Sequence, residues 1–164
     1  MDLLLRGTIV TAEARPENGW IAVADGRIAA IGQGPGAPAA AQTVDYGSAL
    51  ILPGVVDGQT HATSCKGMEG IADTTRGALA GGVTTLVDMP YDNPQPLDRP
   101  ERLAEKTAAI AAHAHADMAL YGTATRETGT AHMRALIGGG VCAFKISSFE
   151  SSPTRFPGIG SVRK

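Results

Sequence analysis

The hydrophobic pattern of residues 1–52 predicts a small β layer. Short runs of apolar and β-branched residues alternate with Gly, Pro and polar residues, which is typical of strands separated by tight turns. Asp25-Gly26 lies between two of these runs and favours a two-residue hairpin turn. The predicted strands cover residues 3–10, 20–24, 27–31 and 49–52.

After Pro53 the pattern changes to strands that alternate with helices, at a repeat of about 25 to 35 residues, the length of a βαβ unit. Such alternation predicts a parallel sheet with right-handed crossovers. Asp98-x-x-Glu101 resembles a capping box, in which Asp98 would accept hydrogen bonds from the first amides of a helix. The predicted strands cover residues 55–61, 83–88, 118–123 and 141–147, and the predicted helices cover residues 74–80, 98–115 and 131–137.

In parallel α/β folds, the functional groups lie at the carboxyl ends of the strands. Side chains alternate between the two faces of a strand, so Asp57, Gln59 and His61 share one face and converge at one strand end. The same alternation places Lys145 on the inner face of the fourth strand, because the opposite face is apolar and suits packing under helices. The residues of that apolar face are Cys142, Phe144 and Ile146.

Lys145 and His61 each have a functional and a structural interpretation. Removing an ammonium group from water is unfavourable, so an inward lysine tends toward the neutral amine, which can add to carbon dioxide and give a metal-binding carbamate. Alternatively, Lys145 lies near the solvated strand end and extends to water or pairs with a carboxylate. His61 is either a metal ligand or a hydrogen-bonded barrel histidine, because one imidazole alone does not make a metal site.

Residues 53–61, Pro-Gly-Val-Val-Asp-Gly-Gln-Thr-His, resemble the first-strand signature of the amidohydrolase superfamily. Residues 69–76 and 80–90 are similar to its cyclic-amide branch, which contains allantoinases, hydantoinases or dihydropyrimidinases, and dihydroorotases. The resemblance extends to about Phe156 and implies an α/β fold, the N-terminal part of a TIM-type (β/α)8 barrel with about four βα units and a small N-terminal β-sandwich layer. We therefore expect the sandwich part in residues 1–52 and the incomplete first half of the barrel in residues 53–164.

The resemblance also implies a metal-dependent hydrolase of cyclic amides or ureides, of the hydantoin, dihydropyrimidine or allantoin type. In the family, two histidines on the first barrel strand bind one metal; His61 matches the second of them, and Gln59 replaces the first. Lys145 matches the carboxylated lysine that bridges two metals, and Asp57 matches an acidic residue that supports the ligands. The candidate metal ligands are thus Gln59, His61 and Lys145, for one or two divalent ions, with zinc as the expected metal.

Other parts of the implied site are less direct. Asn93, Ser147 and Ser148 follow predicted strands and are candidate substrate-binding residues, although Asp-Asn-Pro is also a turn sequence and the two serines could cap their strand. The family's later histidines and its catalytic general-base aspartate have no match in these residues, so that aspartate is expected beyond the chain end. The 164 residues alone are therefore expected to be inactive.

Composition excludes several classes of function. The net charge of -2 comes from 14 basic and 16 acidic residues without a basic run, so we expect neither a nucleic-acid partner nor a membrane surface. The first ten residues are too short and too charged for a signal peptide, and we expect a cytoplasmic protein. Cys65 and Cys142 are isolated in sequence and are expected to be buried or half-buried free thiols.

Two classes of function remain. The first is a hydrolase that acts on a small cyclic amide substrate and, by family resemblance, forms a homo-oligomer, either a dimer or a tetramer. The second is a non-catalytic amidohydrolase homologue that serves as a scaffold or binding protein. Gln59 favours the second class, because an amide is a weaker metal ligand than imidazole.

Overall fold

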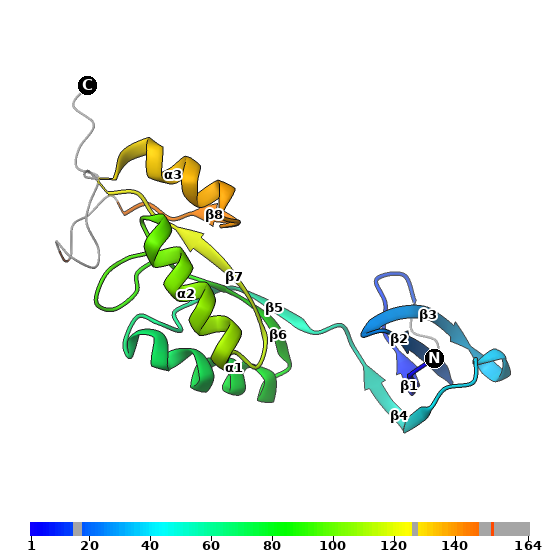
Figure 1. Ribbon diagram of the computed structural model, residues 1–164. Coiled ribbons are helices and arrows are strands. Elements are labelled where there is room, and N and C mark those ends of the chain that lie inside the picture. Colours follow the sequence, from blue (N-terminus) through cyan, green and yellow to red (C-terminus); the bar gives the residue numbers. More distant parts are fainter. Residues whose placement is uncertain (15–17, 126–127, 148–151, 153–164) are drawn as a thin grey trace. The chain divides into compact units, whose positions relative to one another are not determined.

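The computed structural model describes residues 1–14, 18–125, 128–147 and 152 (Figure 1). The chain divides into two compact units, Met1–Pro53 and Gly54–Lys164. Each unit contains one four-stranded sheet, so each is described by itself.

The first unit is a mixed sheet with the strand order β3-β2-β1-β4. β1 pairs with β2 in an antiparallel and with β4 in a parallel arrangement, and β2 and β3 form an antiparallel hairpin. The predicted hairpin turn is confirmed, since Asp25 and Gly26 have φ values of 50° and 71°, the left-handed conformation that a tight two-residue turn requires. The elements are β1 (Leu3–Ile9), β2 (Gly19–Ala24), β3 (Arg27–Gln33), the 3-10 helix η1 (Gly34–Gly36) and β4 (Gln42–Ile51).

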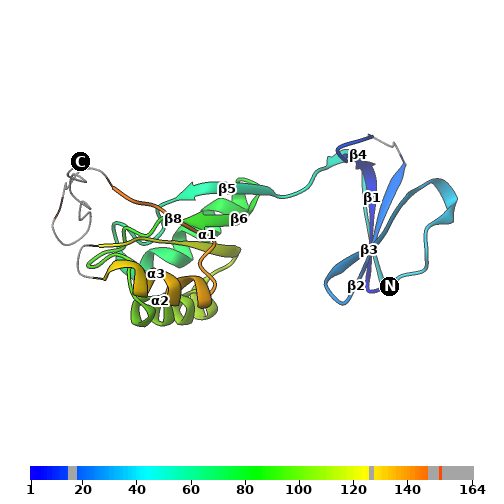
Figure 2. The same cartoon turned by 90° about the horizontal axis from the view of Figure 1, so that it is seen from above.

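The second unit is a curled parallel sheet with the order β5-β6-β7-β8. Figure 2 shows the three helices on one side of this sheet. This arrangement confirms the α/β fold class and the N-terminal half-barrel. The elements are β5 (Val55–Thr60), the 3-10 helix η2 (Gly67–Glu69), α1 (Gly70–Ala80), β6 (Val83–Asp88), α2 (Pro100–His113), β7 (Asp117–Gly122), α3 (Gly129–Gly138) and β8 (Ala143–Phe144).

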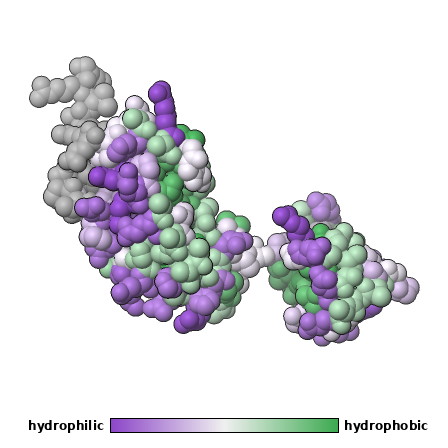
Figure 3. Space-filling model, in the orientation of Figure 1, coloured by the Kyte–Doolittle hydropathy of each residue, from purple (hydrophilic) through white to green (hydrophobic). Residues whose placement is uncertain are grey.

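A leucine-rich core holds α2 and α3 against the end of the sheet. Leu136 of α3 is fully buried and packs with Leu103 of α2 and Leu120 of β7. Phe144 of β8 packs against the same cluster, as the predicted strand alternation requires. On the outer side of the helices, hydrophilic and hydrophobic residues are interspersed (Figure 3), in keeping with the alanine-rich sequence of α2.

Two local predictions are wrong, the extent of the fourth barrel strand and the cap of α2. Among the described residues the fourth barrel strand is Ala143–Phe144, and it ends there because the facing strand β7 ends at Gly122, the residue opposite Phe144; Ile146, beyond it, is 49% exposed. Asp98 does not cap α2: Arg99 is the N-cap residue and makes no side-chain cap bond. Pro100 begins the helix and has no amide hydrogen to be capped, and Asp98 binds Arg99 and Thr125 instead.

Both cysteines also differ from the prediction, since the free thiols of Cys65 and Cys142 are exposed. They lie on a strand-end loop and at the sheet edge, positions where little of the described structure covers them. Among the described helices, none combines the length and the apolar character needed to cross a bilayer.

Leu136→Ala should lower the free energy of unfolding by about 2–5 kcal/mol, because it leaves a cavity in the leucine-rich core. The adjacent Ile137 is 60% exposed, so Ile137→Ala is a matched control with an expected change within about 0.5 kcal/mol. Denaturant unfolding followed by circular dichroism measures both. Equal losses in the two variants would contradict this assignment of the core.

Candidate functional site

His61 follows the last residue of β5, at the carboxyl end of the sheet. Its side chain is exposed, and its Nδ1 lies 3.0 Å from Ser64 Oγ in the same loop. A hydrogen bond at one ring nitrogen fixes the ring and leaves the other nitrogen for a ligand. Nε2 of His61 is therefore the atom available to bind a metal.

Gln59 and Asp57 precede His61 on β5. The Gln59 side chain is exposed, and its backbone N–H donates to Asp57 Oδ1 over 2.9 Å. The half-buried Asp57 carboxylate thus holds the backbone of the strand at Gln59. An exposed amide at this position can be replaced by an imidazole without displacing the described core.

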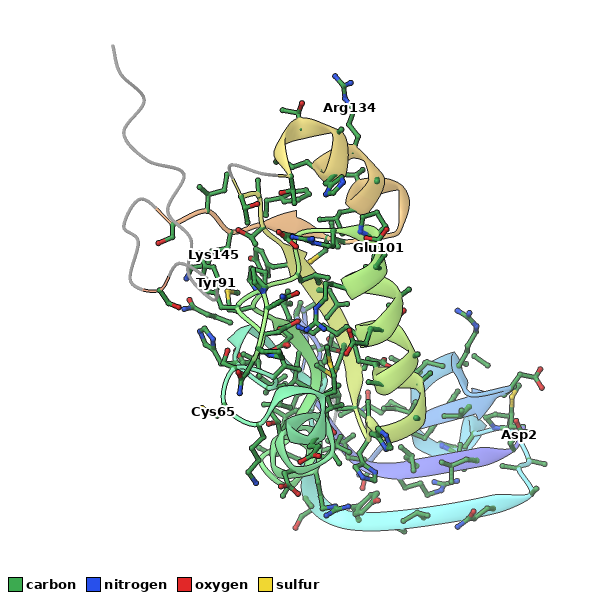
Figure 4. All side chains as sticks on the ribbon, turned by 60° about the vertical axis from the view of Figure 1, so that its left-hand side comes forward. Asp2, Cys65, Tyr91, Glu101, Arg134 and Lys145 are labelled. Carbon is green, nitrogen blue, oxygen red and sulfur yellow. The ribbon has the colours of Figure 1, made fainter. Side chains whose placement is uncertain are left out.

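Lys145 and Ser147 lie beside Tyr91, although these residues come from the loops after β8 and β6. Lys145 Nζ is 5.9 Å from the centroid of the Tyr91 ring, and Figure 4 shows the two side chains next to one another. Burial raises the pKa of the Tyr91 hydroxyl, and a hydrogen bond with Ser147 opposes that shift. Tyr91 remains a neutral phenol near pH 7 and forms one wall beside Lys145.

Asn93 joins the loop after β6 to the loop after β5. Its Nδ2 donates to Cys65 O over 3.0 Å, and its backbone N–H donates to Thr63 O over 3.1 Å. These contacts favour the turn-forming role, since the side-chain amide is used within the protein. Ser148, the remaining substrate-binding candidate, lies outside the described residues.

A buried charged cluster next to these loops was not predicted from the sequence. Lys106 of α2 has no exposed side-chain surface, and its Nζ lies 2.7 Å from Asp88 Oδ2 and 2.7 Å from Asp92 Oδ1. The Thr63 hydroxyl bonds to both carboxylates. A signal for it exists in the sequence: Lys106 lies three residues after Leu103 and four before Ile110, so the helical period places it on the apolar face of α2.

The charges in this cluster do not balance when both carboxylates are ionised. Burial raises the pKa of Asp92, the negative charge of Asp88 adds to that effect, and Lys106 and Thr63 oppose it. Asp92 Oδ2 is buried and has no hydrogen-bond partner among the described residues. Burial thus favours the protonated form of Asp92 by raising the pKa of its carboxyl.

The described residues fit a metal only in part. Among them, no group of three or more His, Cys, Asp or Glu side chains is placed to hold a metal ion. What the strand ends offer is one oriented imidazole at His61, one amine at Lys145 and one exposed amide at Gln59. Such a donor set can begin a zinc site but needs further ligands to complete a tetrahedral one.

No family model matches the chain. It is 34% identical to an allantoinase of Streptomyces avermitilis over 99% of the chain, and 36% identical to an allantoinase of Rubrobacter xylanophilus over 88%. An L-hydantoinase (dihydropyrimidinase) from Arthrobacter aurescens covers 97% of the chain with 26% identity and a TM-score of 0.85. A D-hydantoinase from a Thermus species, 23% identical with a TM-score of 0.73 over 91% of the chain, shows the same fold.

These similarities and the half-barrel sheet agree with the signature on β5. The chain belongs to the cyclic amidohydrolase branch of the amidohydrolase superfamily. It spans 37% of the length of the Streptomyces allantoinase and 36% of that of the Arthrobacter hydantoinase.

Asp92→Asn should flatten the pH dependence of stability. The pKa of Asp92 in the folded protein lies above its ordinary value of 3.8, so its contribution is most favourable below the unfolded pKa and is lost as the pH rises through the folded pKa. Asparagine keeps the shape and stays neutral. Unfolding free energies at a series of pH values from 4 upward should therefore fall less steeply in the variant, with the same direction at every salt concentration.

The control for this comparison is Asp73→Asn, which changes an exposed carboxylate paired with Lys66 at the surface. A screened surface pair contributes little, so the slope should stay close to that of the unchanged protein. If Asp92→Asn and Asp73→Asn changed the slope of unfolding free energy against pH by the same amount, the assignment to Asp92 would be refuted.

Proposed function

We propose that this chain supplies the N-terminal part of the active site of a metal-dependent hydrolase of cyclic amides or ureides, of the hydantoin, dihydropyrimidine or allantoin type. The observation that carries the proposal is the exposed His61 at the carboxyl end of β5, oriented by Ser64. Its support from relatives is that the proteins similar to the chain are named allantoinases and hydantoinases.

In this proposal, His61, Lys145 and Gln59 hold the metal, which is one or two divalent ions with zinc as the expected element. The Lys145 ammonium would first lose a proton, and the free amine would then add to carbon dioxide, forming an N–C bond and releasing a second proton, so that a cation becomes an anionic oxygen ligand. A bound metal supplies a Lewis acid that polarises a ring amide carbonyl and activates water.

The other residues bind and orient. Asp57 supports the backbone on which Gln59 lies, and Tyr91 and Ser147 form the wall beside Lys145. Ser147 and Ser148 are the proposed contacts to the ring amide, and Asn93, whose side-chain amide donates to Cys65 O, holds the neighbouring loop. The general base is not among the 164 residues, because the family's catalytic aspartate has no match in them. By the same resemblance, the whole protein would be a dimer or tetramer.

A second proposal is a non-catalytic homologue that acts as a scaffold or binding protein. Gln59 favours it, because a neutral amide stands where an imidazole would bind the metal. The two proposals differ in whether His61 and Lys145 bind zinc at all.

Gln59→His should strengthen zinc binding by at least about tenfold, because a second imidazole on the same face of β5 would chelate together with His61. Calorimetric zinc titration of the 164-residue chain measures the change. The matched control is Val56→His, since Val56 lies on the opposite face of the same strand and is 62% exposed. Equal gains in both variants would indicate adventitious binding by any added histidine.

Lys145→Ala tests the second ligand in the same titration. If Lys145 contributes to the metal site, its removal lowers the zinc affinity of the Gln59→His variant, and added bicarbonate no longer changes that affinity. Unchanged binding and an unchanged bicarbonate effect would remove Lys145 from the ligand set.

The 164-residue chain itself should have no measurable activity on hydantoin, dihydrouracil or allantoin with zinc present, because it lacks the general base and the further ligands of the family. Product formation can be followed by chromatography across the purification. Turnover that elutes with the chain and disappears in His61→Ala would contradict this expectation; turnover that survives His61→Ala belongs to a contaminant.

A further inference from the structure

The cluster of Lys106, Asp88, Asp92 and Thr63 lies where four segments meet. Lys106 projects from α2, Asp88 ends β6, and Asp92 belongs to the loop that follows β6. Thr63 comes from the loop after β5, the loop that also carries His61 and Ser64. All four side chains are buried, and Lys106, Asp88 and Asp92 have no exposed side-chain surface.

Proton counting shows how tightly the cluster is connected. Lys106 Nζ has three hydrogens, and four oxygens surround it: the two carboxylates, Thr63 Oγ1 at 3.3 Å and Met89 O at 3.4 Å. The Thr63 hydroxyl has one hydrogen but contacts both Asp88 Oδ2 and Asp92 Oδ1. A proton on Asp92 Oδ1 donated to Thr63 Oγ1 would leave the Thr63 hydroxyl free to donate to Asp88 and would make the cluster neutral, while the three ammonium hydrogens would still be shared among four oxygens.

Backbone hydrogen bonds around the cluster also connect the loop after β5 to the end of β6 and the loop after it. The Ala62 N–H donates to Asp88 Oδ1 over 2.7 Å, and the Met89 N–H donates to Thr60 O over 2.8 Å. The Asn93 N–H donates to Thr63 O. Gly67 lies so close that an added Cβ would be 2.9 Å from Asn93 O, and its φ of 64° independently favours glycine. The two strand-end loops are thus held as one piece.

We propose that Lys106 is a positioning residue for the mouth of the half-barrel: held between Asp88 and Asp92, it locks the loop that carries His61 to the loop that carries Tyr91 and Asn93. The ammonium is the only positive charge in the described cluster, and removing it would leave two buried carboxylates facing one another. This inference rests on the proposed function in one respect, namely that the locked loops present the metal site.

Amide hydrogen exchange in Lys106→Met tests the lock. The amides of Ala62, Met89 and Asn93, which make the bonds between or beside the two loops, should exchange at least about tenfold faster, whereas amides in the middle of β7 and α2 should change less. Lys66→Met is the matched control, because Lys66 lies in the loop after β5 but is exposed and pairs with Asp73. Its amide exchange should match that of the unchanged chain.

Thr63→Val provides a second variant, should Lys106→Met fail to fold. Valine has the shape of threonine without the hydroxyl, so it keeps the charges of the cluster and removes the contacts of the Thr63 hydroxyl with Asp88, Asp92 and Lys106. The same three amides should exchange faster. Unchanged exchange in Thr63→Val, or a uniform increase across the sheet in Lys106→Met, would overturn the positioning role.

Zinc titration of the same variants separates this inference from the proposed function. If both hold, Lys106→Met weakens zinc binding by the Gln59→His variant about tenfold, and Lys66→Met does not. If the three amides respond but the Gln59→His variant binds no zinc, the proposed function fails and the lock stands. Zinc binding that is unaffected by the loosened loops would overturn the link between Lys106 and the metal site.

Discussion

The burial of the Lys106 ammonium is the constraint on which the second unit depends. A lysine with no exposed side-chain surface is tolerated only if anionic partners are held at bonding distance, and here Asp88 and Asp92 are both 2.7 Å away. Those partners belong to the end of β6 and to the loop beyond it, so α2 cannot move without separating the charges. The same carboxylates bond to the Ala62 amide and the Thr63 hydroxyl, which extends the constraint to the end of β5.

Much of the fold could be predicted from the sequence, because burial in a parallel sheet leaves apolar runs and tight turns leave Gly and Asp. The hairpin at Asp25-Gly26 and the strand Val83–Asp88 follow from such local signals. The predicted strand bounds were wrong where pairing with a neighbouring strand, rather than local composition, determines where a strand begins or ends. β4 begins at Gln42, before its apolar residues, because its polar start pairs with β1, and β8 ends at Phe144 because the facing strand β7 ends at Gly122.

For the candidate site, the sequence predicts residues but not their contacts. Strand alternation predicts that Asp57, Gln59 and His61 share one face, since two-residue periodicity is a local property. The contact of Lys145 with Tyr91 and the bond between Asn93 and Cys65 join loops after different strands, and no periodicity encodes them. Lys106 left a signal on the apolar face of α2, but its two partners could be identified only in three dimensions.

The two proposed functions differ in the metal ligands and not in the loops that would carry them. The loop that carries His61 is held by specific contacts. Ser64 orients the ring, and the buried cluster fixes the loop to which both residues belong. Holding two carboxylates and an ammonium away from water is unfavourable unless each is bonded, so such a cluster is strongly dependent on its geometry. Gln59, in contrast, is exposed, so a substitution there does not disturb the packing of the core. On the proposed function, a change between histidine and glutamine at residue 59 would alter metal binding and leave the two loops intact, so that the same fold could carry either a metal site or a binding surface.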